Sequence, residues 1–393
     1  MVATSVLATH ESSSFTAISG PTHVFDVSQL EKLVEILTRD GYSVLGPTVR
    51  DGAIVYGPIR SIEDLPKGWT DEQSPGKYRL KRREGEALFA YGVGPQSWKK
   101  YLHLAEVRLW AAERKNGSFR ILDNEAHEER PQAFLGVRAC ELAAIRIQDR
   151  VLLEDRYRDL IYGDRRSQAF IAAVQCTRTG ATCFCASMGT GPAVGDGADL
   201  ILTELVDASG QRFLARAGSE RGNAILAELK TTPASNADLD TAQAAVERAA
   251  KEQARSIDVE NVKELLYQNF EHPRWDSLAA RCLTCANCTM VCPTCFCTTV
   301  EDSSDVSGMH SERWRRWDSC FTQSFSYIHG GSVRTSGKSR YRQWIMHKLA
   351  AWIDQFGTPG CVGCGRCITW CPVGIDITEE VRALREGGNN GNS

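Results

Sequence analysis

The chain has 393 residues, a formal net charge of −3 and 42% hydrophobic residues. Domains run to roughly 100–200 residues, so we expect two or three. The small net charge gives no reason to expect nucleic acid or an anionic membrane as a partner. No apolar run approaches the ~18–20 residues of a membrane helix. The first twenty residues lack the basic start and apolar run of a secretory signal, so we expect a cytoplasmic protein.

The N-terminal elements begin with residues 1–22, whose Ser, Thr and Ala content predicts a disordered tail. Ser28 to Glu31 have the form of a capping box, and the apolar spacing that follows predicts a helix. Two β-type runs on either side of Asp51-Gly52 predict a hairpin. Further strands are expected at 78–82 and 87–92.

From residue 119 the sequence alternates between strand-like and helix-like segments. Strands are expected at 119–123, 133–139, 169–175 and 199–205, with a helix at 141–153. This alternation predicts an α/β layer with a partly parallel sheet. Residues 218–256 predict helices interrupted near Pro233. Together these elements define an N-terminal α/β domain over residues 23–257.

Beyond residue 257 the strand pattern ends. Apolar residues at helical spacing from Trp344 to Phe356 predict a helix that stops at Gly357. We therefore expect a mostly helical domain over residues 258–385 and a disordered tail over 386–393. The predicted fold class is α+β and multidomain.

The fifteen cysteines are clustered, and none precedes residue 140. In a reducing cytosol, cysteines are more often metal ligands or catalytic groups than disulfides. Residues 282–293 (CLTCANCTMVCP) and 361–372 (CVGCGRCITWCP) both have the form C-x2-C-x2-C-x3-C-P. This run binds [4Fe–4S] clusters in two-cluster ferredoxins, where the fourth cysteine ligates the other cluster. The crossed pairing assigns Cys282, Cys285, Cys288 and Cys371 to cluster 1, and Cys361, Cys364, Cys367 and Cys292 to cluster 2.

The long segment between the two motifs favours an α-helical dicluster ferredoxin domain over a compact β-rich one. A zinc-stabilised scaffold is the alternative from another class of protein. Structural zinc sites usually take two separated pairs of ligands, which these motifs match poorly.

Four cysteines lie upstream of the two motifs. Cys140 and Cys176 each follow a predicted strand, and Cys183 and Cys185 lie a few residues further on. If the strands are parallel neighbours, both strand ends meet at one edge of the sheet, where sites form. The four thiols then suggest a third [4Fe–4S] cluster. The alternative is that they are small buried side chains.

The remaining motifs have plainer interpretations. We expect Cys295, Cys297 and Cys320 to pack near the clusters and not to ligate them, and residues 189–197 (GTGPAVGDG) to form a turn-rich loop. A run of arginines either offsets cluster charge, docks an acidic partner or forms a solvated face: Arg313, Arg315, Arg316, Arg334, Arg340 and Arg342. No Ser/His/Asp or Cys/His arrangement is evident, so we expect no catalytic residues.

Several segments resemble one family: GVRACELAAI (136–145), CFCASMGTGP (183–192), CANCTMVCPTCFC (285–297), RYRQWIMHKLAAW (340–352) and CVGCGRCITWCPVGIDI (361–377). The chain is similar, over about residues 24–380, to the β subunit of cytoplasmic NAD(P)-linked [NiFe] hydrogenases, the sulfhydrogenases. That family includes the A subunit of anaerobic sulfite reductase. One departure, His103-Leu104 where a proline-containing stretch is expected, affects a loop.

The resemblance implies an electron-transfer subunit of an oxidoreductase complex, without a substrate site of its own. Such a subunit relays electrons between a flavin subunit that binds NAD(P)H and the small and large [NiFe] subunits, or an external acceptor. The alternative is the corresponding subunit of a sulfite-reducing complex.

Overall fold

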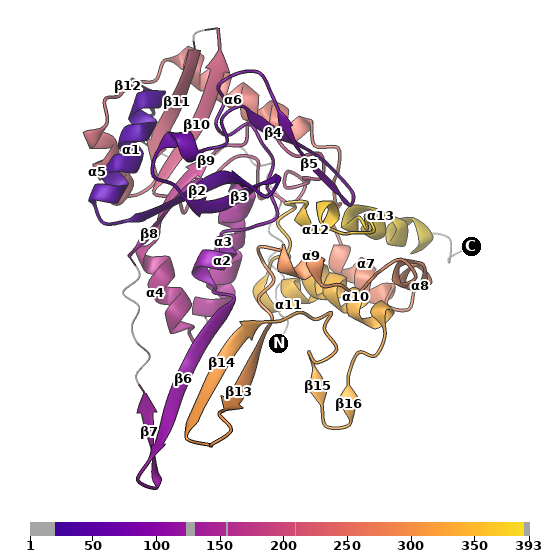
Figure 1. Ribbon diagram of the computed structural model, residues 1–393. Helices are drawn as coiled ribbons and strands as arrows, with labels where there is room; N and C mark the ends of the chain where they lie inside the picture. Colours follow the sequence, from indigo (N-terminus) through magenta and orange to yellow (C-terminus); the bar gives the residue numbers. More distant parts are fainter. Residues whose placement is uncertain (1–19, 123–129, 155, 209, 389–393) are drawn as a thin grey trace, which may run out of the picture.

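The computed structural model describes residues 20–122, 130–154, 156–208 and 210–388. The predicted tails therefore lie largely outside the described residues. An eight-stranded sheet dominates the N-terminal part (Figure 1). Its strands are β1 (His23–Asp26), β2 (Ser43–Arg50), β3 (Ala53–Pro58), β8 (Gln132–Val137), β9 (Phe170–Val174), β10 (Leu200–Asp207), β11 (Gly210–Ala217) and β12 (Thr232–Pro233).

The spatial order of this sheet is β12-β1-β11-β10-β9-β8-β2-β3. The four central strands β2, β8, β9 and β10 pair in parallel, and the outer pairs are antiparallel. The expected partly parallel sheet is therefore present. The parallel pairing of β8 and β9 matters most, because Cys140 and Cys176 follow these two strands.

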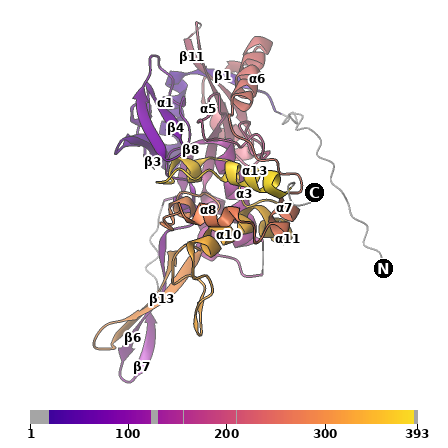
Figure 2. The same ribbon diagram turned by 90° about the vertical axis from the view of Figure 1, so that its right-hand side faces the viewer.

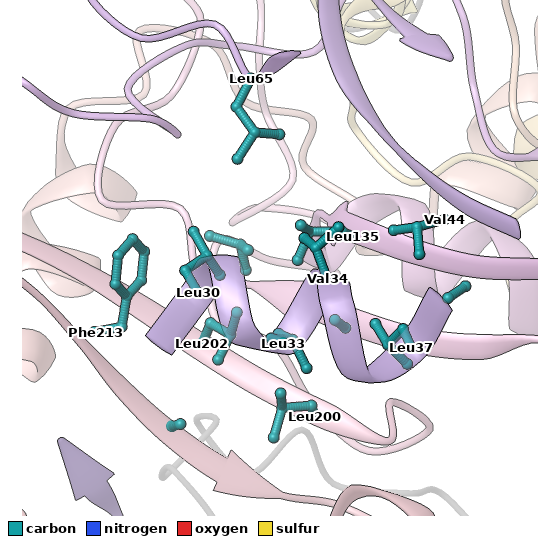
Figure 3. Close-up of a cluster of buried hydrophobic side chains, with 14 of the residues drawn as sticks. Leu30, Leu33, Val34, Leu37, Val44, Leu65, Leu135, Leu200, Leu202 and Phe213 are labelled. Atoms are coloured by element: carbon teal, nitrogen blue, oxygen red, sulfur yellow. The ribbon is translucent and has the colours of Figure 1, made fainter. Parts of the chain in front are cut away.

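Helices cover both faces of the sheet. Helices α1 (Val27–Arg39) and α5 (Glu220–Glu228) pack on one face, and α3 (Ala139–Leu153) and α4 (Leu160–Gln168) pack on the other. Figure 3 shows Leu30, Leu33 and Leu37 of α1 against Leu200 and Leu202 of the sheet. Every residue of β9 is buried, as expected for a central strand covered on both sides.

Two N-terminal predictions are wrong in detail. The N-cap of α1 is Asp26, whose carboxylate accepts from the backbone N–H of Ser28 (2.8 Å), so Ser28 lies inside the helix. Residues 87–92 do not form a strand. The backbone N–H groups of Leu88 and Phe89 donate to the Glu204 carboxylate at 2.6 and 2.8 Å, and this replaces the partner strand that the apolar pattern suggests.

A second sheet projects from the body of the molecule (Figures 1 and 2). In the order β13-β14-β6-β7, it combines β6 (Glu106–Lys115) and β7 (Ser118–Leu122) with β13 (Thr298–Ser304) and β14 (His310–Trp317). The expectation that strands end near residue 257 is therefore wrong. These strands lack an apolar alternation because charged side chains pair across them, for example Arg313 with Asp302 at 2.6 Å.

The elements outside these two sheets include the 16-residue helix α6 (Asn236–Lys251). The others are short: η1 (Ile62–Asp64), β4 (Trp69–Ser74), β5 (Lys77–Arg82), α2 (Lys99–Leu102), β15 (Tyr327–Ile328) and β16 (Gly331–Ser332). Helices surround the two cysteine motifs: α7 (Val262–Gln268), α8 (Arg274–Ala279), α9 (Asn287–Met290), α10 (Gly337–Met346), α11 (Trp352–Phe356), α12 (Arg366–Thr369) and α13 (Ile377–Gly388). A π-helical turn, η2 (His347–Ala351), joins α10 to α11. Helix α13 continues three residues into the range expected to be a tail.

The helices of the C-terminal part share one core, which includes Trp275, Tyr341, Trp344, Leu349 and Ile368. In the described ranges, no helix has the length and apolar character needed to cross a membrane.

Candidate metal centres

The first three cysteines of the first motif share a cavity with the last cysteine of the second motif. This cavity has an empty volume of about 430 Å³, including its mouth, and its wall contains Cys282, Cys285, Cys288 and Cys371. The chain curls around the cavity because Thr284 (φ 51°) and Ala286 (φ 64°) adopt left-handed backbone conformations. The Cys285 residue is exposed, so one side of the cavity faces solvent.

The other three cysteines of the second motif share a cavity with Cys292. Its empty volume is about 310 Å³, and Cys361, Cys364, Cys367 and Cys292 line it. The equivalents of Thr284 and Ala286 here are glycines, with φ of 62° at Gly363 and 75° at Gly365. The structure thus brings together each set of four that the crossed pairing predicts, and the two cavities adjoin because Cys367 lines both.

The chemistry of these thiols fits a metal cluster. Burial raises the pKa of Cys288 and Cys367 well above the ordinary value, and it raises the pKa of Cys361 to about 12. The protonated form of these three thiols is therefore favoured until a metal replaces the proton, because the thiolate is the metal-binding form. Four cysteines line the second cavity, and four besides the shared Cys367 line the first. Four sulfur donors are the donor set of a [4Fe–4S] cluster.

The hydrogen bonds to these sulfurs differ between the two cavities. In the first, the backbone N–H groups of Thr284 and Ile375 donate to Cys282 and Cys371 at 3.4 and 3.3 Å. In the second, the ammonium group of Lys348 donates to Cys292 Sγ at 3.1 Å. Burial alone would lower the pKa of Lys348, but the thiolate charge of Cys292 and its neighbours outweighs it and raises that pKa.

The four upstream cysteines converge at the carboxyl edge of the sheet. Cys140 lies in the first turn of α3, just after β8, and Cys176 follows the parallel strand β9. Cys140 and Cys185 belong to one buried cluster that also contains Cys364. Burial raises the pKa of Cys183, and the neighbouring thiolates of Cys185 and Cys176 raise it further.

Two polar side chains face the upstream sulfurs. Gln253 Nε2 donates to Cys185 Sγ at 3.1 Å, and Arg138 Nη1 lies 3.9 Å from Cys176 Sγ. Arg138 is buried, and its other acceptors among the described residues are the carbonyl oxygens of Gln175, Phe89 and Tyr91. A buried cation without a carboxylate partner is costly unless another anion lies close by.

The loop that carries Cys183 and Cys185 rests directly on the second motif. The backbone N–H of Phe184 donates to the Gly363 carbonyl at 2.8 Å, and Thr190 Oγ1 donates to the Val362 carbonyl at 2.7 Å. A Cβ atom at Gly363 would lie only 2.6 Å from the Cys185 nitrogen. The upstream group therefore borders the second cavity without an intervening layer of side chains at this point.

The glycine-rich segment 189–197 is irregular, as expected, and Gly191 packs beside Cys185, where an added Cβ would lie 3.1 Å from the sulfur. Cys295, Cys297 and Cys320 line neither cavity. Cys297 and Cys320 are hydrogen-bonded to each other, which lowers the pKa of Cys297 to about 7. Their role as packing residues remains a prediction.

Most of the arginine run is paired within the chain. Arg313 pairs with Asp302, Arg315 with Asp159, and Arg316 with both Glu301 and Glu106. Arg340 is buried and donates to backbone oxygens of Cys320 and Thr322. These four side chains therefore have structural partners.

A single metal ion finds no ready site in the described ranges, where no group of three or more His, Cys, Asp or Glu side chains could hold one. Zinc–sulfur bonds are about 2.3 Å long, so a zinc site draws its thiolates close together. Analysis of metal and acid-labile sulfide distinguishes the zinc-scaffold alternative from [4Fe–4S] clusters.

Sequence reasoning missed the polar side chains that face the sulfurs. Lys348 falls within the apolar repeat of 344–356, where a single lysine is ordinarily a solvated residue. Arg138 directly precedes helix α3, which carries Cys140. Its position two residues before that cysteine was the one feature of the sequence that could have pointed to a role at the site.

Comparison with known proteins agrees with this arrangement. Residues 281–375 match the family model described as a 4Fe-4S dicluster domain. The chain is 34% identical over 279 residues to "Sulfhydrogenase 2 subunit beta" of Pyrococcus furiosus, an alignment that covers 70% of this chain and 80% of the relative. No solved structure matches the chain.

The dicluster match and the paired cavities define an iron–sulfur electron-transfer protein with [4Fe–4S] clusters in its C-terminal part. At this identity and coverage, the chain belongs to the sulfhydrogenase β-subunit family. It is an iron–sulfur electron-transfer subunit.

Proposed function

We propose that Cys282, Cys285, Cys288 and Cys371 ligate one [4Fe–4S] cluster, and that Cys361, Cys364, Cys367 and Cys292 ligate a second. The observation that carries this proposal is the composition of the two cavity walls. Each has the first three cysteines of one motif and the last of the other, and Cys367 lies between the two cavities and lines both. When bound, such clusters accept and release single electrons. The chain's own part is to hold the sulfurs, keep water out and set the surrounding charge.

We further propose that Cys140, Cys176, Cys183 and Cys185 hold a third [4Fe–4S] cluster. The buried guanidinium of Arg138 supports this, because its Nη1 lies 3.9 Å from Cys176 Sγ, where a thiolate-bound cluster would place negative charge. The alternative, four plain buried thiols, would leave the buried Glu204 carboxylate as a source of negative charge for Arg138.

The three cysteine groups then form a row. The upstream group borders the second cavity through Gly363, and the second cavity adjoins the first through Cys367. Only the first cavity has an exposed cysteine, Cys285. Electrons would pass along this row, with Cys285 marking the end that faces solvent.

For partners, we propose a hydrogenase-type complex. The relative from Pyrococcus furiosus is named as a sulfhydrogenase subunit, and by analogy this chain would relay electrons between a flavin subunit that binds NAD(P)H and a pair of [NiFe] subunits. An anaerobic pull-down with mass spectrometry tests this. Co-purifying [NiFe] subunits support it, whereas a sirohaem subunit would assign the chain to a sulfite-reducing complex instead.

The ligand sets are tested by iron analysis of the full chain purified without oxygen. Three clusters of about four irons each predict near twelve irons per chain. Cys176→Ser is expected to lower the iron content to about eight per chain. Cys288→Ser removes a proposed ligand of cluster 1 and is expected to lower the iron content as well. Cys320→Ser is the control, because Cys320 is likewise a free cysteine but lines neither cavity. Unchanged iron in Cys176→Ser would refute the third cluster alone.

A further inference from the structure

Lys348 is a buried lysine at the wall of the second cavity. Only 5% of its surface is exposed. Its ammonium group donates to Cys292 Sγ at 3.1 Å, to Thr294 Oγ1 at 2.8 Å and to the Gly360 carbonyl at 3.0 Å. These three acceptors use all three N–H bonds of the ammonium group, so its position is fixed.

The same contacts join the two halves of the second ligand set. Thr294 Oγ1 lies 3.2 Å from Cys292 Sγ and donates to the Gly360 carbonyl at 2.7 Å. Gly360 directly precedes Cys361, the first cysteine of the second motif. Lys348 and Thr294 therefore tie the crossing cysteine to the motif whose cluster it would complete.

The helix is locally distorted where it presents this lysine. Lys348 lies in the π-helical turn η2, which interrupts the continuous run from α10 to α11. Such turns are rare and occur often at functional sites, because a widened turn alters which side chains face inward. The distortion is an observation independent of the hydrogen bonds.

The charge of Lys348 has no carboxylate to balance it within the described residues, since its acceptors are a sulfur, a hydroxyl and a carbonyl. The first cavity differs. There, in the part of the chain that the structure describes, the sulfurs of Cys282 and Cys371 receive hydrogen bonds from backbone N–H groups alone, which carry no net charge. The two cavities thus hold similar sulfur donors in unequal electrostatic surroundings.

We propose that Lys348 raises the reduction potential of the cluster on Cys292, Cys361, Cys364 and Cys367 above that of the cluster at the exposed end. Reduction adds one negative charge to a cluster, and a buried cation beside a ligand sulfur stabilises the reduced form more than the oxidised form. The cluster in the middle of the row then holds the electron in preference to its exposed neighbour. This inference rests on the ligand sets proposed above.

The test is an EPR-monitored redox titration of the full chain, purified and reconstituted without oxygen, together with iron analysis. Lys348→Met keeps the length of the side chain and removes its charge, and Cys361→Ser identifies the signal of the second cluster. We expect Lys348→Met to lower the midpoint potential of that signal and to move the exposed cluster's signal less. Lys263→Met is the control, because Lys263 pairs with Asp354 at the surface, and no shift is expected.

If Lys348→Met fails to bind its full iron, Thr294→Val decides the question. It keeps the lysine but removes one of its three acceptors and the hydroxyl contact with Cys292, so a smaller downward shift is expected. A variant that binds as much iron as the wild type but has an unchanged midpoint potential at the second cluster would overturn the role of Lys348. The proposed ligand sets would remain intact. A wild-type chain without two distinct [4Fe–4S] signals would instead refute the ligand sets.

Discussion

Gly363 lies where the upstream cysteine loop meets the second cysteine motif, so Gly363→Ala perturbs this contact directly. The glycine has φ of 62°, and an added Cβ would lie 2.6 Å from the Cys185 nitrogen and 2.7 Å from the Phe184 carbonyl carbon. Both neighbours are backbone atoms and cannot rotate away. The loop must therefore move as a unit, or the motif must change its conformation.

Two costs add at this position. A residue other than glycine in the left-handed region costs about 1–2 kcal/mol, and forcing atoms into a filled interior costs about 1–3 kcal/mol. Gly357→Ala isolates the first cost, since Gly357 has φ of 68° and no atom of the described residues lies within 4 Å of an added Cβ. We expect Gly363→Ala to lower the free energy of unfolding by about 1–3 kcal/mol more than Gly357→Ala does.

The assay is anaerobic guanidinium unfolding of both variants, followed by tryptophan fluorescence and by the visible absorbance of the clusters. The midpoint of Gly363→Ala should fall further in both signals. Equal midpoints for the two variants would show that the loop does not rest on the second motif as described. The upstream cysteines could then no longer be placed next to the second cavity.

The remaining predictions concern three other sites. Arg366→Met breaks a fully buried ion pair with Glu141, so it should lower the free energy of unfolding by about 3–5 kcal/mol. Adding Glu141→Gln should restore part of the lost stability in denaturant titrations. If the double variant is no more stable than Arg366→Met, the two charges are not paired. Burial lowers the pKa of His103 from 6.5 to about 4, so the folded state favours the neutral imidazole. The stability that this preference contributes is fully present above pH 6.5 and is lost as the pH falls from 6.5 toward 4. That difference corresponds to about 3 kcal/mol, and His103→Phe should flatten the fall in unfolding midpoint over this range, whereas an unaltered slope would exclude His103 as its source. Asp26→Ala should cost about 1 kcal/mol as the loss of an N-cap, whereas Ser28→Ala should cost less in the same titration; the reverse order would contradict the cap assignment.

The central sheet and the cysteine groups were predictable because each depends on a short-range pattern. The apolar runs around residues 133–139 and 169–175 correspond to β8 and β9, and their parallel pairing brings Cys140 and Cys176 to one edge. The spacing of the two C-terminal motifs likewise anticipated which cysteines would share a cavity. Patterns of this kind are predictive because the spacing of the residues follows the periodicity of the backbone.

The remaining features depend on contacts between distant segments. Residues 87–92 have the apolar composition of a strand, but Glu204 satisfies two of their backbone N–H groups. Strand β14 pairs with β6, and the two strands are separated in the sequence by about half of the chain. The charged sequence of β14 has no apolar alternation from which a strand could be predicted. Lys348 illustrates the same limit for the site, since only the folded structure places its ammonium group on Cys292.

The central claim is that this chain carries electrons on [4Fe–4S] clusters held by the paired motifs. Its most direct test is joint analysis of iron, acid-labile sulfide and the EPR spectrum of the full chain, purified anaerobically and reduced with dithionite. The account predicts a brown protein with at least about eight irons, matching sulfide and two interacting [4Fe–4S] signals. A colourless protein that contains zinc and no labile sulfide would contradict it.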